Sequence, residues 1–181
     1  MEEILAGISG VVLTAVAALG VFLRRQGDAR LILHTNRATG FRVDKVEEGE
    51  GESRVEISWR MPLINYGRQN GMVLEVLGQV EYPGEIYSRL EVLPRFRLQG
   101  LRRDWYWEAV IIKKRARHVV EGSVVIRFQG SLAELREQLD RLKMVVYYKV
   151  IGRGKMAWRT GDLRIPLAII PVSQGEGGKR E

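Results

Sequence analysis

Residues 54–61 read RVEISWRM, and polar and apolar side chains alternate along the whole stretch. Successive side chains of a strand point to opposite faces, so one face here is apolar and the other polar. The apolar face comprises Val55, Ile57, Trp59 and Met61. This pattern predicts a strand buried on one side. Pro62 follows directly, and because proline has no backbone N–H, it predicts a sheet edge or a bulge there.

Segments of the same kind recur along the chain, separated by turn residues such as Asn65, Gly67 and Gly71. Asparagine and glycine tolerate the backbone angles that tight turns need. We expect about eight or nine short strands among ten candidate segments. The candidate segments are 30–35, 41–46, 54–61, 74–82, 90–98, 105–112, 119–128, 144–150, 156–158 and 163–169.

One helix interrupts this pattern late in the chain. Ser131 and Glu134 have the spacing of a capping box, in which each side chain bonds to a backbone N–H at the helix start. Leucines then recur at helical spacing, at 132, 135, 139 and 142. Strand periodicity returns after them, and Gly152-Arg153-Gly154 predicts a hairpin turn between the strands on either side.

Many short strands with one late helix predict a mainly β fold, an antiparallel β-sandwich, rather than alternating βαβ units. A helix just before the penultimate strand, tyrosines 147 and 148 within that strand, and a hairpin to the last strand resemble the plan of immunoglobulin-like sandwiches. The likeness is architectural, because the chain has no cysteine to form the disulfide of antibody domains.

A second feature stands before the sandwich. Residues 4–23 read ILAGISGVVLTAVAALGVFL and contain no charge. At about 1.5 Å per residue, twenty helical residues reach roughly 30 Å, the thickness of the hydrocarbon core of a bilayer. We therefore expect a single transmembrane helix. A cleaved signal peptide is the alternative, although the acidic leader Met1-Glu2-Glu3 is atypical of one.

The charges around this helix predict its orientation. Glu2 and Glu3 precede it, whereas Arg24, Arg25 and Arg30 follow it. The positive-inside rule then places the N-terminus outside and the following domain in the cytoplasm. The predicted organisation is a membrane anchor at 1–25, a linker at 26–29, the sandwich at 30–172 and a disordered tail at 173–181.

The densest basic region lies in the middle of the sandwich sequence, where cations alternate with aromatic residues. Such mixtures suit single-stranded nucleic acid or anionic lipid headgroups, but they also occur when aromatics are core residues and the cations are solvated. All three interpretations stay open at this stage. The candidate polyanion or interface patch consists of Arg95, Arg97, Arg102, Arg103, Trp105, Trp107, Lys113, Lys114, Arg115 and Arg117.

Catalytic and cofactor motifs are not evident. The chain has no cysteine and two histidines, His34 and His118, so thiolate chemistry and a histidine-rich metal site are excluded. No serine lies in a nucleophile elbow, and no two acids are singled out by their spacing. We expect no cofactor, no bound metal and no enzymatic activity. The net charge of +7 is compatible with solubility alone or with attraction to an anionic membrane surface.

The sequence therefore favours a single-pass, membrane-anchored β-sandwich that acts as an accessory or protein-interaction module. The alternative is peripheral binding of anionic lipid or nucleic acid through the basic and aromatic patch. Among partners, we expect the membrane and a protein, and nucleic acid is disfavoured because no nucleic-acid-binding signature is present.

Overall fold

The computed structural model describes residues 2–25, 27–81, 84, 86, 88–101, 107–153 and 155–171, with side chains of the first helix described at 12–22 and 25. Its elements in chain order are α1 (Glu2–Arg25), β1 (Leu31–Leu33), the 3-10 turn η1 (Thr35–Arg37), β2 (Thr39–Glu48), β3 (Ser53–Asn65), β4 (Gly71–Glu81), β5 (Leu90–Leu98), β6 (Val110–Ile112), β7 (Arg117–Phe128), α2 (Leu132–Gln138), β8 (Arg141–Ile151), β9 (Met156–Pro166) and the 3-10 turn η2 (Leu167–Ile169).

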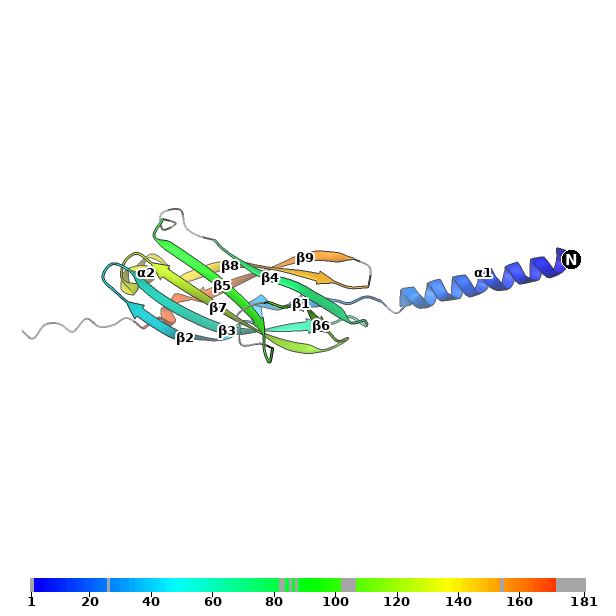
Figure 1. Ribbon diagram of the computed structural model, residues 1–181, viewed down its shortest axis with the longest axis horizontal. Coiled ribbons are helices and arrows are strands. Elements are labelled where there is room, and N and C mark those ends of the chain that lie inside the picture. The colour runs from blue at the N-terminus through cyan, green and yellow to red at the C-terminus, as the bar shows by residue number, and fades with distance from the viewer. Residues whose placement is uncertain are drawn as a thin grey trace, which may run out of the picture.

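The strands form two antiparallel sheets that pack into a sandwich (Figure 1). In the first sheet, β1 and β2 both pair with β3, and β7 and β5 follow in that order. The second sheet has the order β6-β4-β8-β9. Apolar residues of both sheets meet in one buried core, including Val55 and Ile57 from the first and Val76 and Val146 from the second. The predicted antiparallel β-sandwich is therefore confirmed.

The strand order matches that of a constant-type immunoglobulin sandwich, in which strands A-B-E-D form one sheet and G-F-C the other. Here β1 and β2 occupy the place of A, β3 of B, β7 of E and β5 of D, while β9, β8 and β4 occupy G, F and C. The short strand β6 is an addition at the outer edge of β4. Helix α2 lies between β7 and β8, where the sequence predicts it.

Trp59 fills the inner face of the first sheet opposite a glycine. Trp59 pairs with Gly122 on β7, and Gly122 pairs with Phe96 on β5. The indole is 1% exposed, and its ring centroid lies 6.2 Å from that of Phe96, edge to face. A Cβ at Gly122 would lie 2.4 Å from the indole, so this glycine makes room for the largest side chain of the core.

Gly122→Ala should therefore lower the free energy of unfolding by about 1–3 kcal/mol, because the added methyl displaces the indole of Trp59. Chemical denaturation of the full-length protein measures this change. Gly84→Ala is the matched control, since an added Cβ at Gly84 has no atom within 4 Å. Equal stability of the two variants would contradict the packing described here.

The sequence predicts a sheet edge or a bulge at Pro62, and this prediction is wrong. Pro62 is buried in β3, which has neighbouring strands on both sides. It lies where the partner of β3 changes: β2 pairs as far as Arg60, and β1 pairs from Leu63 onward. The Pro62 carbonyl accepts the backbone N–H of His34 at 2.9 Å. A proline is tolerated here because no strand needs its missing N–H at the point of exchange.

Three other boundaries differ from the predicted ones. Of the strand expected at 105–112, the described residues 107–112 contain only β6, Val110–Ile112, and Trp107 precedes it in irregular structure. The segments 156–158 and 163–169 belong largely to one strand, β9. Helix α2 ends at Gln138, so the expected helical leucine at 142 lies instead in β8, from which its side chain packs into the sandwich core.

Helix α1 extends away from the sandwich in Figure 1. Its described side chains from Val12 to Phe22 are all exposed, so the sandwich covers none of them. Over the residues whose side chains are described, no helix is both long and apolar enough to cross a membrane.

Candidate functional site

The basic and aromatic region predicted from the sequence is distributed over several places. Arg102, Arg103 and Trp105 lie outside the described residues. The other seven members fall into three groups: two arginines on β5, one tryptophan beside β4, and four cations around the turn between β6 and β7.

Arg95 and Arg97 lie on the outer side of the first sheet, and Arg97 is bound to a carboxylate. Its Nε and Nη2 donate to Oε2 of Glu121 on β7, at 2.8 and 2.7 Å. Arg60 on β3 reaches the other oxygen of Glu121 at 3.7 Å. Because Glu121 lies between the two arginines, the charge of Arg97 is largely compensated locally, and Arg95 is the more available cation of this pair for an external anion.

Trp107 lines a groove between the edges of the two sheets. Its Nε1 donates to the carbonyl of Val73 at 3.4 Å, and its ring packs against the core. The groove measures about 480 Å³ and runs between β4 and β5. Its lining residues are Leu74, Glu75, Val76, Leu77, Gly78, Pro94, Arg95, Phe96 and Trp107.

The sheets approach closely in this groove, since a Cβ at Gly78 would lie 2.9 Å from Pro94. Strand β6 covers the outer edge of β4 from Gly71 to Val73. In the described chain, no strand covers that edge between Leu74 and Glu81, so a row of backbone groups faces outward beside the groove. Leu77 is 47% exposed there.

The remaining cations of the predicted patch, Lys113, Lys114, Arg115 and Arg117, occupy the turn from β6 to β7, and all four are exposed. The Lys114 backbone N–H donates to Oδ1 of Asn70 at 2.9 Å, which fastens this turn to the turn between β3 and β4. Arg115 has a positive φ of 56°, a conformation that turns the chain sharply at the tip.

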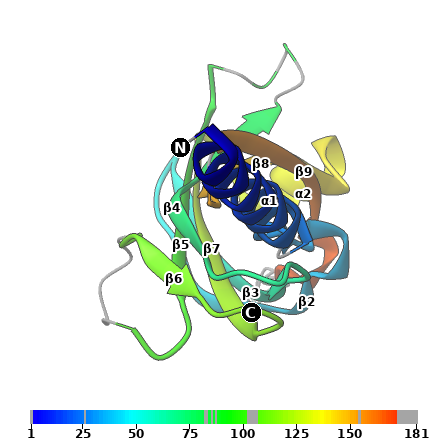
Figure 2. The same cartoon turned by 90° about the vertical axis from the view of Figure 1, so that its right-hand side faces the viewer.

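This turn belongs to the end of the sandwich from which α1 leaves. We call it the proximal end and define it by residues 27–30, 66–70, 111–117, 152, 153 and 155. Figure 2 views the molecule from this side, with α1 in front of the sandwich. Strand register brings the segments together: Leu31 pairs with Asn65, Gly71 with Ile112, and Ile151 with Met156.

The segment that joins α1 to the sandwich is fastened to this end. Oδ1 of Asp28 accepts the backbone N–H of Arg153 at 2.7 Å, and the Asp28 carbonyl accepts that of Arg68 at 3.3 Å. A Cβ at Gly67 would lie 2.2 Å from the same carbonyl, so only glycine permits this approach. Arg68 also reaches back with Nη1 to the carbonyl of Arg25, at 3.4 Å.

Asn65 is the centre of this network and is fully buried. Its Oδ1 accepts the backbone N–H groups of Arg30 and Gly67, at 3.1 and 2.9 Å. Its Nδ2 donates to the carbonyls of Gln69 and Ile112, at 2.8 and 3.2 Å. One side chain thus ties together the joining segment, the turn after β3 and strand β6.

The proximal end collects exposed cations from four separate parts of the sequence, which are Arg30, Arg68, Lys113, Lys114, Arg115, Arg117, Arg153 and Lys155. Four of them lie outside the predicted patch. The sequence signal that could have found them is topological: in an antiparallel sandwich, alternate connections lie at the same end, and the turns at 66–70 and 152–154 are visible in the sequence.

His34 lies next to these cations. Its Nε2 is 2.9 Å from the hydroxyl of Tyr66. Burial lowers the pKa of His34 below its ordinary value of 6.5, and the charges of Arg37 and Arg117 lower it further. The unfolded chain therefore binds a proton at this histidine more readily than the folded chain does, and the folded state should lose stability as the pH falls below 6.5.

His34→Gln should flatten the dependence of the unfolding free energy on pH between neutral and mildly acidic conditions, because it removes this titration. Denaturant titrations of the full-length protein at several pH values measure the slope. A slope equal to that of the unsubstituted protein would contradict the assignment.

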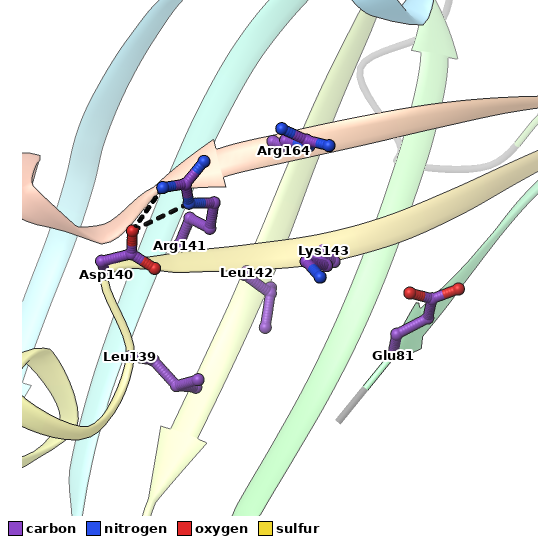
Figure 3. Close-up of a pocket in the computed structure, with 7 residues that line it drawn as sticks. All are labelled: Glu81, Leu139, Asp140, Arg141, Leu142, Lys143 and Arg164. Atoms are coloured by element: carbon purple, nitrogen blue, oxygen red, sulfur yellow. Dashed lines mark hydrogen bonds and ion pairs between the residues drawn. The ribbon is translucent and has the colours of Figure 1, made fainter. Parts of the chain in front are cut away.

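A cleft of about 620 Å³ lies at the opposite end of the sandwich (Figure 3). Its two acids, Glu81 and Asp140, lie on opposite sides of the cleft rather than facing one another. Asp140 Oδ2 accepts Nε and Nη2 of Arg141 at 2.8 and 2.6 Å, and this hydrogen bonding lowers the pKa of Asp140. The carboxyl pair is therefore not arranged for acid–base catalysis.

No cluster of three or more histidine, aspartate or glutamate side chains that could hold a metal ion occurs among the described residues.

Ser131 caps α2 as the sequence predicts, since its Oγ accepts the backbone N–H of Glu134 at 3.2 Å. The side chain of Glu134 instead binds Nη1 of Arg89 at 2.8 Å, which also lowers the pKa of Glu134.

No protein-family model matches this sequence, and no curated protein matches it. Two solved structures are similar in their chain path. The GAE domain of yeast GGA1 is 7% identical with a TM-score of 0.36, over 69% of this chain and 98% of that one. The GAE domain of GGA2p from Saccharomyces cerevisiae is 8% identical with a TM-score of 0.34, over 76% and 97%. These weak likenesses carry no argument about function, and the fold assignment rests on the strand order above.

Proposed function

We propose that this protein is a single-pass, membrane-anchored β-sandwich that acts as a non-enzymatic protein-interaction module. The observation that carries the proposal is the contrast between α1 and the sandwich. Val12, Leu13, Val16, Leu19 and Phe22 are between 55% and 72% exposed, whereas the sandwich buries its own apolar residues in one core. An uncovered apolar helix is stable when lipid solvates it.

Extraction of membranes that contain the full-length protein tests the anchor. An integral protein stays in the membrane pellet after alkaline carbonate treatment, whereas a peripheral protein is released. Retention supports the proposal, and quantitative release would overturn it.

We further propose that the N-terminus lies outside and the sandwich in the cytoplasm, because the arginines at the C-terminal side of α1 favour the cytoplasmic face. The chain has no native cysteine, so a single Ala168→Cys substitution on the exposed turn η2 gives a clean reporter. A membrane-impermeant thiol reagent should label this cysteine only after cell lysis. Labelling in intact cells would reverse the orientation.

The groove between β4 and β5 is the proposed partner-binding surface, and its occupant is an extended segment of a partner protein. The edge of β4 between Leu74 and Glu81, which no strand of the described residues covers, offers backbone groups to a further strand. The apolar side chains of Leu77, Pro94 and Trp107 beside it offer contact area for the partner's side chains.

Site-specific photo-crosslinking in cells tests the groove. A photoreactive amino acid in place of Leu77 should give a discrete adduct with another protein, and Leu77→Asp with the crosslinker at Leu74 should abolish it. Val46 is the matched control position, because it is 38% exposed and lies on β2 at the opposite edge of the sandwich. The same adduct from Val46, or none from Leu77, would contradict this placement.

A further inference from the structure

The proximal end and the opposite end of the sandwich differ in charge. Eight exposed lysines and arginines lie at the proximal end, as described above. Among the described residues, the connections at the opposite end contain more acids than cations: the acids are Glu50, Glu52, Glu134, Glu137 and Asp140, and the cations are Arg89 and Arg136. The charge difference therefore runs along the strands, from the end next to α1 to the end farthest from it.

We infer that the proximal end of the sandwich is a binding surface for anionic lipid headgroups, which holds the domain upright on the membrane that α1 enters. This inference rests on the membrane anchor proposed above. Its residues overlap only in part with the patch predicted by the sequence: Lys113, Lys114, Arg115 and Arg117 are shared. The other four, Arg30, Arg68, Arg153 and Lys155, come from other segments.

The first support is position. The joining segment is held against the sandwich by Asp28 and Asn65, and Arg68 contacts the carbonyl of Arg25 in the last turn of α1. The turn that contains Arg68 therefore lies beside the C-terminal end of the helix, at the same end of the sandwich as the other proximal loops. If α1 spans the bilayer, these loops lie at the level of the lipid phosphates on that side.

The second support is the availability of the charges. Within the described chain, Arg30, Arg68, Lys113, Lys114 and Arg115 make no ion pair with a carboxylate. The one acid in the joining segment, Asp28, uses its carboxylate to accept the backbone N–H groups of Ala29 and Arg153. Lysine and arginine side chains in this position are attracted to anionic lipid within a Debye length of the surface.

The third support is the direction of the charge difference. The acids at the opposite end are repelled by an anionic surface, while the cations at the proximal end are attracted. Both effects favour the same orientation, with the strands standing roughly perpendicular to the membrane. A protein merely kept soluble by its charge would not require this segregation.

The test uses full-length protein reconstituted into vesicles with the sandwich on the outer side. Ile111→Cys places a fluorophore at the proximal end without changing a charge, since Ile111 is 61% exposed on β6. Ala168→Cys places it at the opposite end. Lipids with a spin label on the headgroup quench a fluorophore that lies near the phosphates.

We expect quenching at Ile111→Cys to be at least about twofold stronger in vesicles of phosphatidylcholine with phosphatidylglycerol than in phosphatidylcholine alone, and to fall towards the neutral-vesicle value as salt rises. Quenching at Ala168→Cys should stay low in both. Quenching at Ile111→Cys that is independent of lipid charge, or equal at both positions, would overturn the inference.

A charge-matched pair of variants distinguishes lipid binding by the proximal end from an effect of the protein's net charge. Replacing Lys113, Lys114 and Arg115 by glutamine should remove most of the added quenching. Replacing Lys143, Arg159 and Arg164 on β8 and β9 by glutamine removes the same number of charges and should leave it unchanged. Equal losses in the two variants would show a net-charge effect and contradict the inference.

Two further outcomes are informative. If carbonate releases the full-length protein, the proposed anchor fails, whereas retention without charge-dependent quenching overturns the headgroup surface alone. If a single-stranded oligonucleotide changes the Ile111→Cys fluorescence of protein in neutral vesicles while anionic lipid does not, the surface binds nucleic acid and the lipid assignment is wrong.

Discussion

Full-length protein with Leu13→Arg and Val16→Arg should fail to integrate into membranes and should appear in the carbonate supernatant or aggregate. An arginine near the centre of a membrane-spanning helix costs about 2.5–3.5 kcal/mol in insertion experiments, and two of them offset much of the apolar gain of the segment. Both positions lie on α1, with side chains 72% and 64% exposed, so neither substitution disturbs the sandwich core. Membrane fractionation of cells that express the variant measures the result.

The control for this prediction adds the same two charges elsewhere. Val46→Arg and Leu77→Arg change exposed positions on β2 and β4, and this variant should remain in the membrane pellet. Recovery of the α1 variant with membranes that float in a density gradient, where aggregates sediment, would mean that α1 does not span the bilayer.

Asn65→Ala should be among the most destabilising single substitutions outside the apolar core. It removes this partner from the N–H groups of Arg30 and Gly67 and from the carbonyls of Gln69 and Ile112; the bonds to Gly67 and Ile112 are buried, and the other two are partly buried. A buried polar group without a partner costs about 1–3 kcal/mol, and the effects at one site add only in part, so we expect a loss of about 2–4 kcal/mol. Denaturation of the full-length protein measures the loss, and hydrogen exchange should accelerate at the amides of Arg30 and Gly67.

Asn70→Ala is the matched control, because Asn70 is exposed and its side chain accepts one backbone N–H, that of Lys114. A single exposed hydrogen bond of this kind contributes less than about 1 kcal/mol. If the two variants are equally stable, the buried network does not hold the proximal end together.

The alternation at residues 54–61 was a sound guide to the fold because burial on one face of a sheet leaves a period of two in the sequence. Val55, Ile57, Trp59 and Met61 are each at most 1% exposed. The cap at Ser131 was equally visible, since that hydrogen bond is local. The burial of Pro62 inside the sheet is not visible in the local sequence, because the change of neighbour from β2 to β1 along β3 depends on segments far away in the chain.

The site was harder to predict for the same reason. A search along the sequence groups cations that are close in the chain, so it assigns Arg97 and Lys113 to one patch. In the structure the two lie in different places, and Arg97 is bound to Glu121. It separates Arg30, Arg68 and Arg153, which the strand register brings to one end. The expected strand at 105–112 places Trp107 within a strand. The observed strand β6 is shorter, and Trp107 precedes it and donates a hydrogen bond to the carbonyl of Val73.

The fastened segment between α1 and β1 has a geometric consequence for any partner. Leu74 lies three residues and Gly78 seven residues along β4 from Gly71, which is next to the proximal end. At the usual rise per strand residue, these separations are about 10 Å and about 23 Å. If α1 is the membrane anchor proposed above, so tight a joint gives the groove a nearly constant height above the bilayer. A partner's binding segment would then have to lie at that height, which would select proteins attached to the same membrane or proteins with a spacer of matching length.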